Sequence, residues 1–304
     1  MGLRPKTFEQ FVGQANLKKT LDITIQSANK RNAALPHILF DSGIGGLGKT
    51  TLANIIASTL GVDIQVANGG NLRSVKNILP YIFRTSFRSV LFIDEIHRIP
   101  RLVEEFLYPV MEDLRVDMLD QSGEEPVSID LEPFTLIGAT TLGGSLSQPF
   151  VDRFPIYEHL EVYNTKELAK VIIQKGLDLK LTISQAVATN IAKRSRGIPR
   201  VAINLVLWCR DFAITYNAPT ITGDVVKRAM ALREVDDDGL TKQDKTYIRV
   251  LLKNYDGGPV GVKTLASALQ MSEETIIQTV EPFLIWKGLV NKTSKGRKYI
   301  GKQQ

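Results

Sequence analysis

The segment from Gly43 to Thr50 constrains the fold of this chain more than any other. It reads Gly-Ile-Gly-Gly-Leu-Gly-Lys-Thr, which fits the pattern of a glycine, any four residues, then Gly-Lys-Ser/Thr. An apolar run at residues 38–40 precedes it, and residues 51–60 follow with apolar side chains at helical spacing. The sequence therefore predicts a strand, a glycine-rich turn and a helix, which together begin an α/β domain.

The residue types in this turn are typical of a nucleoside triphosphate site. Glycines allow successive backbone amides to point into the turn, and the amino terminus of the next helix adds partial positive charge. The Lys49 side chain can reach the outer phosphates of ATP, and the Thr50 hydroxyl can ligate Mg²⁺. The backbone amides expected to contact phosphate are those of Gly43, Gly46, Leu47 and Gly48.

Two carboxylates follow a second apolar run. Residues 90–93 are Val-Leu-Phe-Ile, and Asp94 and Glu95 come directly after them. Ligands bind at the carboxyl ends of parallel strands, so we expect both acids beside the phosphates. Asp94 is the predicted Mg²⁺-side residue and Glu95 the predicted base that takes a proton from an attacking water. His97, two residues later, is interpreted as a packing and hydrogen-bonding residue without a metal role.

The remaining pattern predicts three domains. Short, mainly apolar runs lie at residues 38–40, 64–66, 90–93 and 134–137. They indicate a parallel sheet covered on both faces, in a domain spanning residues 1–163. Residues 164–237 are predicted to be all-helical, with Thr165, Ser184 and Thr222 as helix caps. In residues 238–304, the pattern predicts helices near 241–254, 262–269 and 273–286, followed by a hairpin that turns at 294–296. This order of elements is that of a winged-helix module.

Composition narrows the class of protein. The chain has 304 residues and a formal net charge of +6, with a basic carboxyl-terminal region compatible with nucleic-acid binding. Its single cysteine, Cys209, lies in an apolar segment and is expected to be buried, which suits a reducing, cytoplasmic setting. No apolar run reaches the length of a membrane-spanning helix, and the first residues lack an apolar signal region.

Several longer strings resemble one family. Residues 4–14 (Arg-Pro-Lys-Thr-Phe-Glu-Gln-Phe-Val-Gly-Gln), 91–98 (Leu-Phe-Ile-Asp-Glu-Ile-His-Arg) and 133–141 (Pro-Phe-Thr-Leu-Ile-Gly-Ala-Thr-Thr) resemble the RuvB family of AAA+ ATPases, as do 194–197 (Arg-Ser-Arg-Gly) and 257–261 (Gly-Gly-Pro-Val-Gly). The resemblance covers nearly the whole chain in order. It implies a large ATPase domain, a helical lid and a winged-helix domain. It also implies a hexameric ring around duplex DNA that moves Holliday junctions with a RuvA partner.

The resemblance assigns further residues by position. Leu3 and Arg4 would lie near the adenine, and Thr51 would join Lys49 and Thr50 at the phosphates and Mg²⁺. Thr141 matches the sensor-1 position, at the end of the strand predicted over 134–139. Arg153 matches the arginine finger of the family, and Tyr163 matches its nucleotide-contacting tyrosine. Arg200 matches the sensor-2 arginine. The finger would act on the γ-phosphate of the neighbouring subunit.

The resemblance also places two partner surfaces. Lys292, Lys295 and Arg297 match the DNA-contacting wing, where they would bind phosphates without reading bases. Residues 115–130 match a β-hairpin that docks on RuvA, with Val116, Met118 and Leu119 as its apolar contact candidates.

The chain departs from the family pattern at several positions. Ile44 and Gly45 stand where the family has two prolines, and the loop is one residue longer because of residues 41–42. A looser loop with Asp41 beside it predicts weaker nucleotide binding than is usual in the family. The docking hairpin is shorter, Leu142 replaces an arginine after Thr141, and Glu273 replaces an arginine of the recognition helix.

Three interpretations stay open at this point. The first is an ATP-driven DNA motor that moves four-way junctions as a hexamer. The second is a clamp-loader-like or helicase-loader ATPase that uses the same fold as a switch. The third is a DNA-binding scaffold in which the altered phosphate loop has impaired turnover.

Overall fold

The computed structural model describes residues 4–119 and 126–301. Leu3 lies outside the described residues, so its predicted adenine contact is a prediction only. By its contacts the chain divides into two units, Met1–Val162 and Tyr163–Gln304. In the described ranges, no helix combines the length and the apolar character needed to span a membrane.

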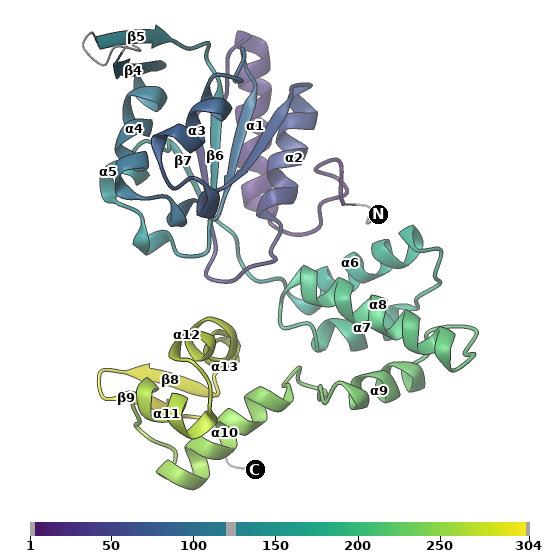
Figure 1. Ribbon diagram of the computed structural model, residues 1–304. Helices are drawn as coiled ribbons and strands as arrows, with labels where there is room; N and C mark the ends of the chain where they lie inside the picture. The colour runs from purple at the N-terminus through teal and green to yellow at the C-terminus, as the bar shows by residue number, and fades with distance from the viewer. Residues whose placement is uncertain (1–3, 120–125, 302–304) are drawn as a thin grey trace. The chain divides into compact units, whose positions relative to one another are not determined.

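The first unit is built on a five-stranded parallel sheet with the strand order β2-β3-β6-β1-β7. Four of its strands coincide with the predicted apolar runs, and the three in the middle of the sheet are buried because helices cover both faces (Figure 1). The strands are β1 (Ile38–Asp41), β2 (Ile64–Asn68), β3 (Val90–Asp94), β6 (Thr135–Thr140) and β7 (Ile156–His159).

Helices α1 (Ala15–Arg31) and α2 (Lys49–Leu60) lie on one face of this sheet, and α3 (Val75–Ile82) and α4 (Arg101–Glu112) lie on the other (Figure 1). Shorter turns connect them: η1 (Gly69–Asn71), η2 (Ile96–Arg98), η3 (Gly143–Ser145) and α5 (Gln148–Val151). An apolar core fills the α3–α4 side and includes Ile78, Leu91, Leu107 and Phe150, all fully buried. Because all five strands are parallel, their carboxyl ends lie along one edge of the sheet.

A two-stranded hairpin, β4 (Arg115–Leu119) and β5 (Pro126–Asp130), follows α4. Val116 is fully buried and belongs to the core, which corrects its prediction as a docking contact. Among the hairpin side chains that the structure describes, the exposed large apolar ones are Val127 and Ile129, on the other strand. Val116 pairs directly with Ile129, so these side chains share one face of the hairpin, and α4 packs against β4. The sequence alone did not show which of the two strands α4 contacts.

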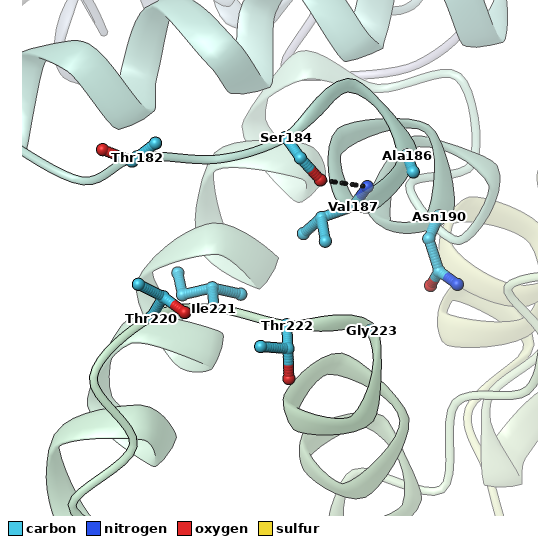
Figure 2. A pocket seen from close by; sticks show the side chains of 9 residues that line it. All are labelled: Thr182, Ser184, Ala186, Val187, Asn190, Thr220, Ile221, Thr222 and Gly223. Atoms are coloured by element: carbon cyan, nitrogen blue, oxygen red, sulfur yellow. Dashed lines mark hydrogen bonds between the residues drawn. The ribbon is translucent and has the colours of Figure 1, made fainter.

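The second unit begins with four helices, as predicted: α6 (Thr165–Asp178), α7 (Gln185–Lys193), α8 (Pro199–Thr215) and α9 (Gly223–Leu232). Ser184 and Thr222 cap α7 and α9, and both border an open pocket in this part of the unit (Figure 2). Asn164, rather than the predicted Thr165, caps α6, because it forms a reciprocal capping box with Glu167. Cys209 is buried, and burial raises the pKa of its thiol to about 12.

The carboxyl-terminal part of this unit has the predicted helices and hairpin. Helices α10 (Lys242–Tyr255) and α11 (Val262–Leu269) precede a helical stretch made of α12 (Glu273–Thr275), the π-turn η4 (Ile276–Val280) and α13 (Glu281–Trp286). Strands β8 (Val290–Thr293) and β9 (Gly296–Tyr299) form the antiparallel wing. Tyr247, Leu265 and Val290 pack in the apolar core that these helices and strands share.

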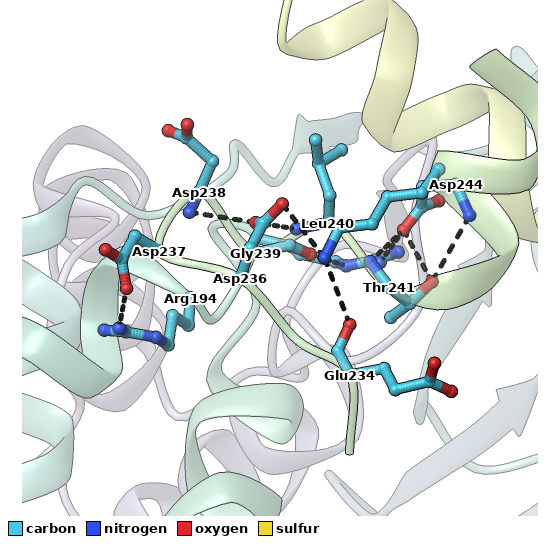
Figure 3. Close-up of polar contacts among 11 residues, drawn as sticks. Arg194, Glu234, Asp236, Asp237, Asp238, Gly239, Leu240, Thr241 and Asp244 are labelled. Atoms are coloured by element: carbon cyan, nitrogen blue, oxygen red, sulfur yellow. Dashed lines mark hydrogen bonds and ion pairs between the residues drawn. The ribbon is translucent and has the colours of Figure 1, made fainter. Parts of the chain in front are cut away.

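Two arginines join the helical lid to the winged helix (Figure 3). Arg194 pairs with Asp237, and Arg196 pairs with Asp244, whose side chain is 1% exposed. Arg196 Nε also donates to the carbonyl of Gly239 at 3.0 Å, and its guanidinium lies over the Phe283 ring, 4.5 Å from the centroid. The acidic segment at residues 234–239 and the start of α10 are therefore held at several points by one turn of the lid.

Candidate functional site

The glycine-rich loop connects β1 to α2 and has the backbone that its glycines allow. Gly46 and Gly48 adopt positive φ values of 90° and 111°, a region that side chains disfavour. A Cβ added at Gly43 or Gly45 would meet nothing within 4 Å, so the loop borders open space. Because α2 begins at Lys49, its unpaired amides and its partial positive charge face this loop. An open, amide-lined cradle of this kind suits a polyphosphate.

Lys49 lies against the loop rather than in solvent. Its side chain is 7% exposed, and Nζ donates to Oγ of the buried Ser42. Ser42 Oγ in turn donates to the carbonyl of Ile44 at 2.7 Å. The one-residue extension at positions 41–42 therefore supplies a hydroxyl that orients the ammonium group at the entrance of the loop.

The Asp41 carboxylate is engaged by the neighbouring strand β7. Tyr157 Oη donates to Asp41 Oδ2 at 3.0 Å, and His159 Nδ1 lies 3.3 Å from the same oxygen. Burial, followed by this hydrogen bond, raises the pKa of Tyr157. The Asp41 carboxylate is thus held by two side chains of β7, and weaker nucleotide binding stays a prediction.

Beside the loop lie a hydroxyl and a carboxylate that could both bind Mg²⁺. Thr50 Oγ1 donates to Asp94 Oδ2 at 3.3 Å, and the backbone amide of Glu95 donates to Asp94 Oδ1 at 3.1 Å. Hydroxyl and carboxylate oxygens are the protein ligands that Mg²⁺ takes next to phosphates. The residues present therefore fit Mg²⁺ with a nucleoside triphosphate.

Glu95 follows β3 with a backbone that few residues with side chains adopt. Its φ is 53°, and a Cβ added at Gly69 would lie 2.3 Å from its carbonyl oxygen. Its carboxylate is 38% exposed and lies 3.4 Å from His97 Nε2. A partly exposed acid at this edge can contact a water molecule, as a general base must.

The end of β6 contacts the same group. Thr140 is buried; its Oγ1 accepts from the Leu142 amide at 2.9 Å and lies 3.0 Å from His97 Nδ1. Thr141 follows directly and is partly exposed. The sequence interpretation of His97 as a hydrogen-bonding residue agrees with this geometry, but it missed that one of the two contacts is with the candidate base.

Arg153 has all its recorded partners outside this group. Its guanidinium donates to the Pro149 carbonyl at 2.6 Å and to Glu112 Oε2 at 3.0 Å, and it lies over the Tyr108 ring, 4.0 Å from the centroid. It precedes β7, whose first residue, Ile156, pairs with the first residue of β1, whereas the loop follows the last. The recorded contacts of Arg153 therefore do not bring it to the glycine-rich loop.

The other predicted nucleotide contacts are dispersed. Arg4 is exposed, and Thr51 is half-buried in the first turn of α2. Tyr163 and Arg200 belong to the second unit, where Tyr163 is 4% exposed and Arg200 is exposed near the start of α8.

Of the three wing side chains predicted to contact DNA, two are exposed. Lys292 and Lys295 are exposed, but Arg297 is only 7% exposed. Its guanidinium donates to Glu281 at 2.7 Å and 3.2 Å, and this contact raises its pKa. Arg297 therefore serves the fold and is removed from the set of DNA-contact candidates. Lys298, the next residue, is exposed and was not singled out from the sequence.

Comparison with known proteins agrees across the whole chain. Residues 3–160 match the Holliday junction DNA helicase RuvB P-loop domain, 163–236 the RuvB AAA lid domain, and 237–302 the RuvB C-terminal winged-helix domain. The chain is 42% identical over 297 residues to the Holliday junction branch migration complex subunit RuvB of Rhodopirellula baltica, covering 97% of this chain and 81% of that protein.

Solved structures give the same result. The Holliday junction branch migration motor RuvB of Thermotoga maritima matches with a TM-score of 0.87 at 39% identity, covering 98% of this chain and 95% of that one. A point mutant of the same protein matches with a TM-score of 0.89 at 38% identity, with 98% and 95% covered. With its AAA+ ATPase, lid and winged-helix modules, this chain belongs to the RuvB family.

Proposed function

We propose that this protein is an ATP-driven DNA motor that moves Holliday junctions during recombination and repair, acting as a hexameric ring with a RuvA-type partner. The observation that carries the proposal is the convergence of Lys49, the Thr50–Asp94 pair and Glu95 on one edge of the sheet. Its domains are residues 1–163 for the ATPase, 164–237 for the lid and 238–304 for DNA contact. A cytoplasmic setting follows from that role.

Each residue has a defined part in the reaction. The loop amides and Lys49 bind the phosphates of ATP, and Thr50 and Asp94 hold Mg²⁺, which supplies charge neutralisation when bound. The Glu95 carboxylate orients a water and accepts its proton. Thr141 contacts the outer phosphate, and Arg153 adds positive charge from the next subunit. Arg4, Thr51, Tyr163 and Arg200 complete the nucleotide contacts, with Leu3 beside the adenine.

The partner surfaces follow from exposure. Lys292, Lys295 and Lys298 on the wing bind DNA phosphates, which gives affinity without sequence preference and suits a motor that crosses any sequence. Val127 and Ile129 on the hairpin, with the half-buried Met118, are the apolar contacts for the partner. The side chain of Leu119, also predicted there, lies outside the described residues.

ATP hydrolysis and branch migration by wild-type protein and Glu95→Gln, with and without a synthetic four-way junction, test the proposal. We expect junction-stimulated turnover and strand exchange in the wild type, and bound but uncut ATP in Glu95→Gln. Turnover without branch migration, even with a cognate partner, would favour the loader-type switch. Junction binding without turnover would favour the scaffold.

A further inference from the structure

His97 lies between the candidate base and the end of β6. Its Nε2 is 3.4 Å from Glu95 Oε2, and its Nδ1 is 3.0 Å from Thr140 Oγ1. Its side chain is 10% exposed, and burial lowers the pKa of the imidazole below its ordinary value. The turn η2 places the ring there, since His97 is its central residue. One buried side chain therefore connects two strands of the sheet at their carboxyl ends.

The contacts around His97 favour one of its two neutral tautomers. Thr140 Oγ1 accepts from the Leu142 amide at 2.9 Å, and its own hydrogen can donate to His97 Nδ1. Nδ1 is then the acceptor, and the hydrogen of a neutral ring lies on Nε2. That nitrogen faces the Glu95 carboxylate, whose negative charge favours an N–H over a lone pair. The Leu142 amide, the Thr140 hydroxyl, the His97 ring and the Glu95 carboxylate thus form one chain of polar contacts, in which each group donates to the next.

We propose that His97 is a positioning residue for hydrolysis: it holds the carboxylate of Glu95 and links that carboxylate to the end of the strand that carries Thr140 and Thr141. This inference rests on the proposed role of Glu95 as the base. The Glu95 backbone is already fixed by its contact with Gly69, but its side chain is partly exposed. Among the described residues, His97 is the one ion-pair partner recorded for that carboxylate.

The linkage has a chemical consequence. A general base must lie within about 2.6–3.2 Å of the proton it accepts, and a misplacement of about 1 Å can cost about 100-fold in rate. A base held by His97 is therefore sensitive to the conformation of residues 140–142, where the sensor position lies. Nucleotide binding relies on other groups, because Lys49 is oriented by Ser42 and the loop amides are set by the start of α2.

The test compares two replacements that each keep one half of the imidazole. A glutamine amide reaches the position of Nε2, whereas an asparagine amide reaches only that of Nδ1. We expect His97→Asn to lower kcat about 10- to 100-fold, with the ATP dissociation constant and the thermal midpoint close to wild type. We expect His97→Gln to recover most of that loss. Equal activity of the two variants, or a kcat of His97→Asn within twofold of wild type, would overturn the proposal.

Thr140→Val supplies the second arm, because it removes the hydroxyl and keeps the shape. We expect a smaller loss of kcat, and we expect the double variant with His97→Asn to be no slower than His97→Asn alone, since both changes break the same series. Additive losses would show that the two residues act separately and would also overturn the linkage. Failure of the proposed role of Glu95 is distinct, because Glu95→Gln would then keep wild-type turnover. Failure of the proposed motor function would appear in the wild type, as turnover without branch migration or as binding without turnover.

Discussion

At the scale of single residues, the proposed ring would use Arg153 of one subunit at the nucleotide of the next. Three groups hold its guanidinium: the Tyr108 ring, the Glu112 carboxylate and the Pro149 carbonyl. Such anchoring reduces the rotamer entropy that a long side chain loses on binding a phosphate. Hydrolysis would then require an assembled ring.

Mixing two inactive variants tests that requirement. Arg153→Ala should lower ATP turnover by about 10³- to 10⁵-fold, because a finger contributes about this much in related enzymes. Glu95→Gln should be similarly inactive. An equimolar mixture should regain activity measured by phosphate release, since some interfaces pair an intact Glu95 with an intact Arg153. Mixtures as inactive as their components would show that the two residues do not act across an interface.

His37 predicts a pH dependence of stability. The Leu136 amide donates to His37 Nδ1 at 2.9 Å, and Nε2 lies 3.1 Å from the Met111 carbonyl, so the folded protein holds the ring neutral. Burial lowers the pKa of His37 below its ordinary value of 6.5. Below pH 6.5 the unfolded chain takes up a proton that the native state does not, so stability falls with decreasing pH.

The loss attributable to His37 can reach about 1.4 kcal/mol per pH unit, and it is absent above the unfolded pKa. Urea unfolding of wild type and His37→Gln between about pH 5 and pH 8, values chosen to bracket its ordinary pKa, measures it. We expect the variant to be less stable at the upper end of this range but to lose less as the pH is lowered. Parallel pH profiles for the two proteins would contradict this assignment.

At the scale of elements, periodicity predicted most of the fold but not its edges. Strands β1, β3 and β6 were predictable because each is a continuous apolar run buried on both faces. Strand β7 was missed because it has no apolar run and alternates half-buried with exposed residues. Helix α1 was also missed, although Leu17, Leu21 and Ile25 recur every four residues and are buried.

The candidate site divides in the same way. Lys49, Thr50, Asp94 and Glu95 were predictable because the loop motif and the strand end require them locally. The pairing of Arg297 with Glu281 was not, because it joins residues 16 positions apart through the tertiary fold. The close approach of Gly69 to the Glu95 backbone depends on the β2–β3 register in the same way. Local patterns predict chemistry, whereas partners brought together by packing require coordinates.

The wing supports a prediction that separates its lysines from its arginine. Replacing Lys292, Lys295 and Lys298 by glutamine should weaken duplex binding and reduce the slope of log affinity against log salt by about 0.9 for each DNA phosphate that is no longer neutralised. The thermal midpoint should stay near wild type, because all three side chains are exposed. Fluorescence anisotropy with labelled duplex at several salt concentrations measures the slope.

Arg297→Gln is the matched control on the same strand. It leaves Glu281, whose side chain is 2% exposed, without its cationic partner, so we expect a loss of about 3–5 kcal/mol of stability. At a temperature where this variant remains folded, its salt slope should equal that of the wild type. A reduced slope for Arg297→Gln with unchanged stability would return this residue to the DNA-contact set.

At the scale of the whole molecule, the joint of Arg194 and Arg196 connects the lid with the winged helix. Arg196→Ala would leave Asp244 buried without its cation, at an expected cost of about 3–5 kcal/mol. Because the same change removes the interactions with Gly239 and Phe283, we expect the winged helix to unfold separately. Calorimetry should show an additional transition at lower temperature.

Arg210→Ala is the control for that experiment. Arg210 lies on α8 and pairs with the exposed Asp211, so its removal should change stability by no more than about 0.5 kcal/mol. If Arg196→Ala unfolds in the same single transition as this control, the joint does not couple the two modules.

The joint also determines how force would pass through this protein. Both arginines come from the short turn between α7 and α8, and their partners lie at 237–244. A pull on the wing would therefore be borne by the buried Arg196–Asp244 ion pair and the stacked Phe283 ring, with the more exposed Arg194–Asp237 pair beside them, rather than by the backbone of the acidic segment. Force from a load on the DNA would reach the helical lid through these contacts, without first extending the segment between the two modules.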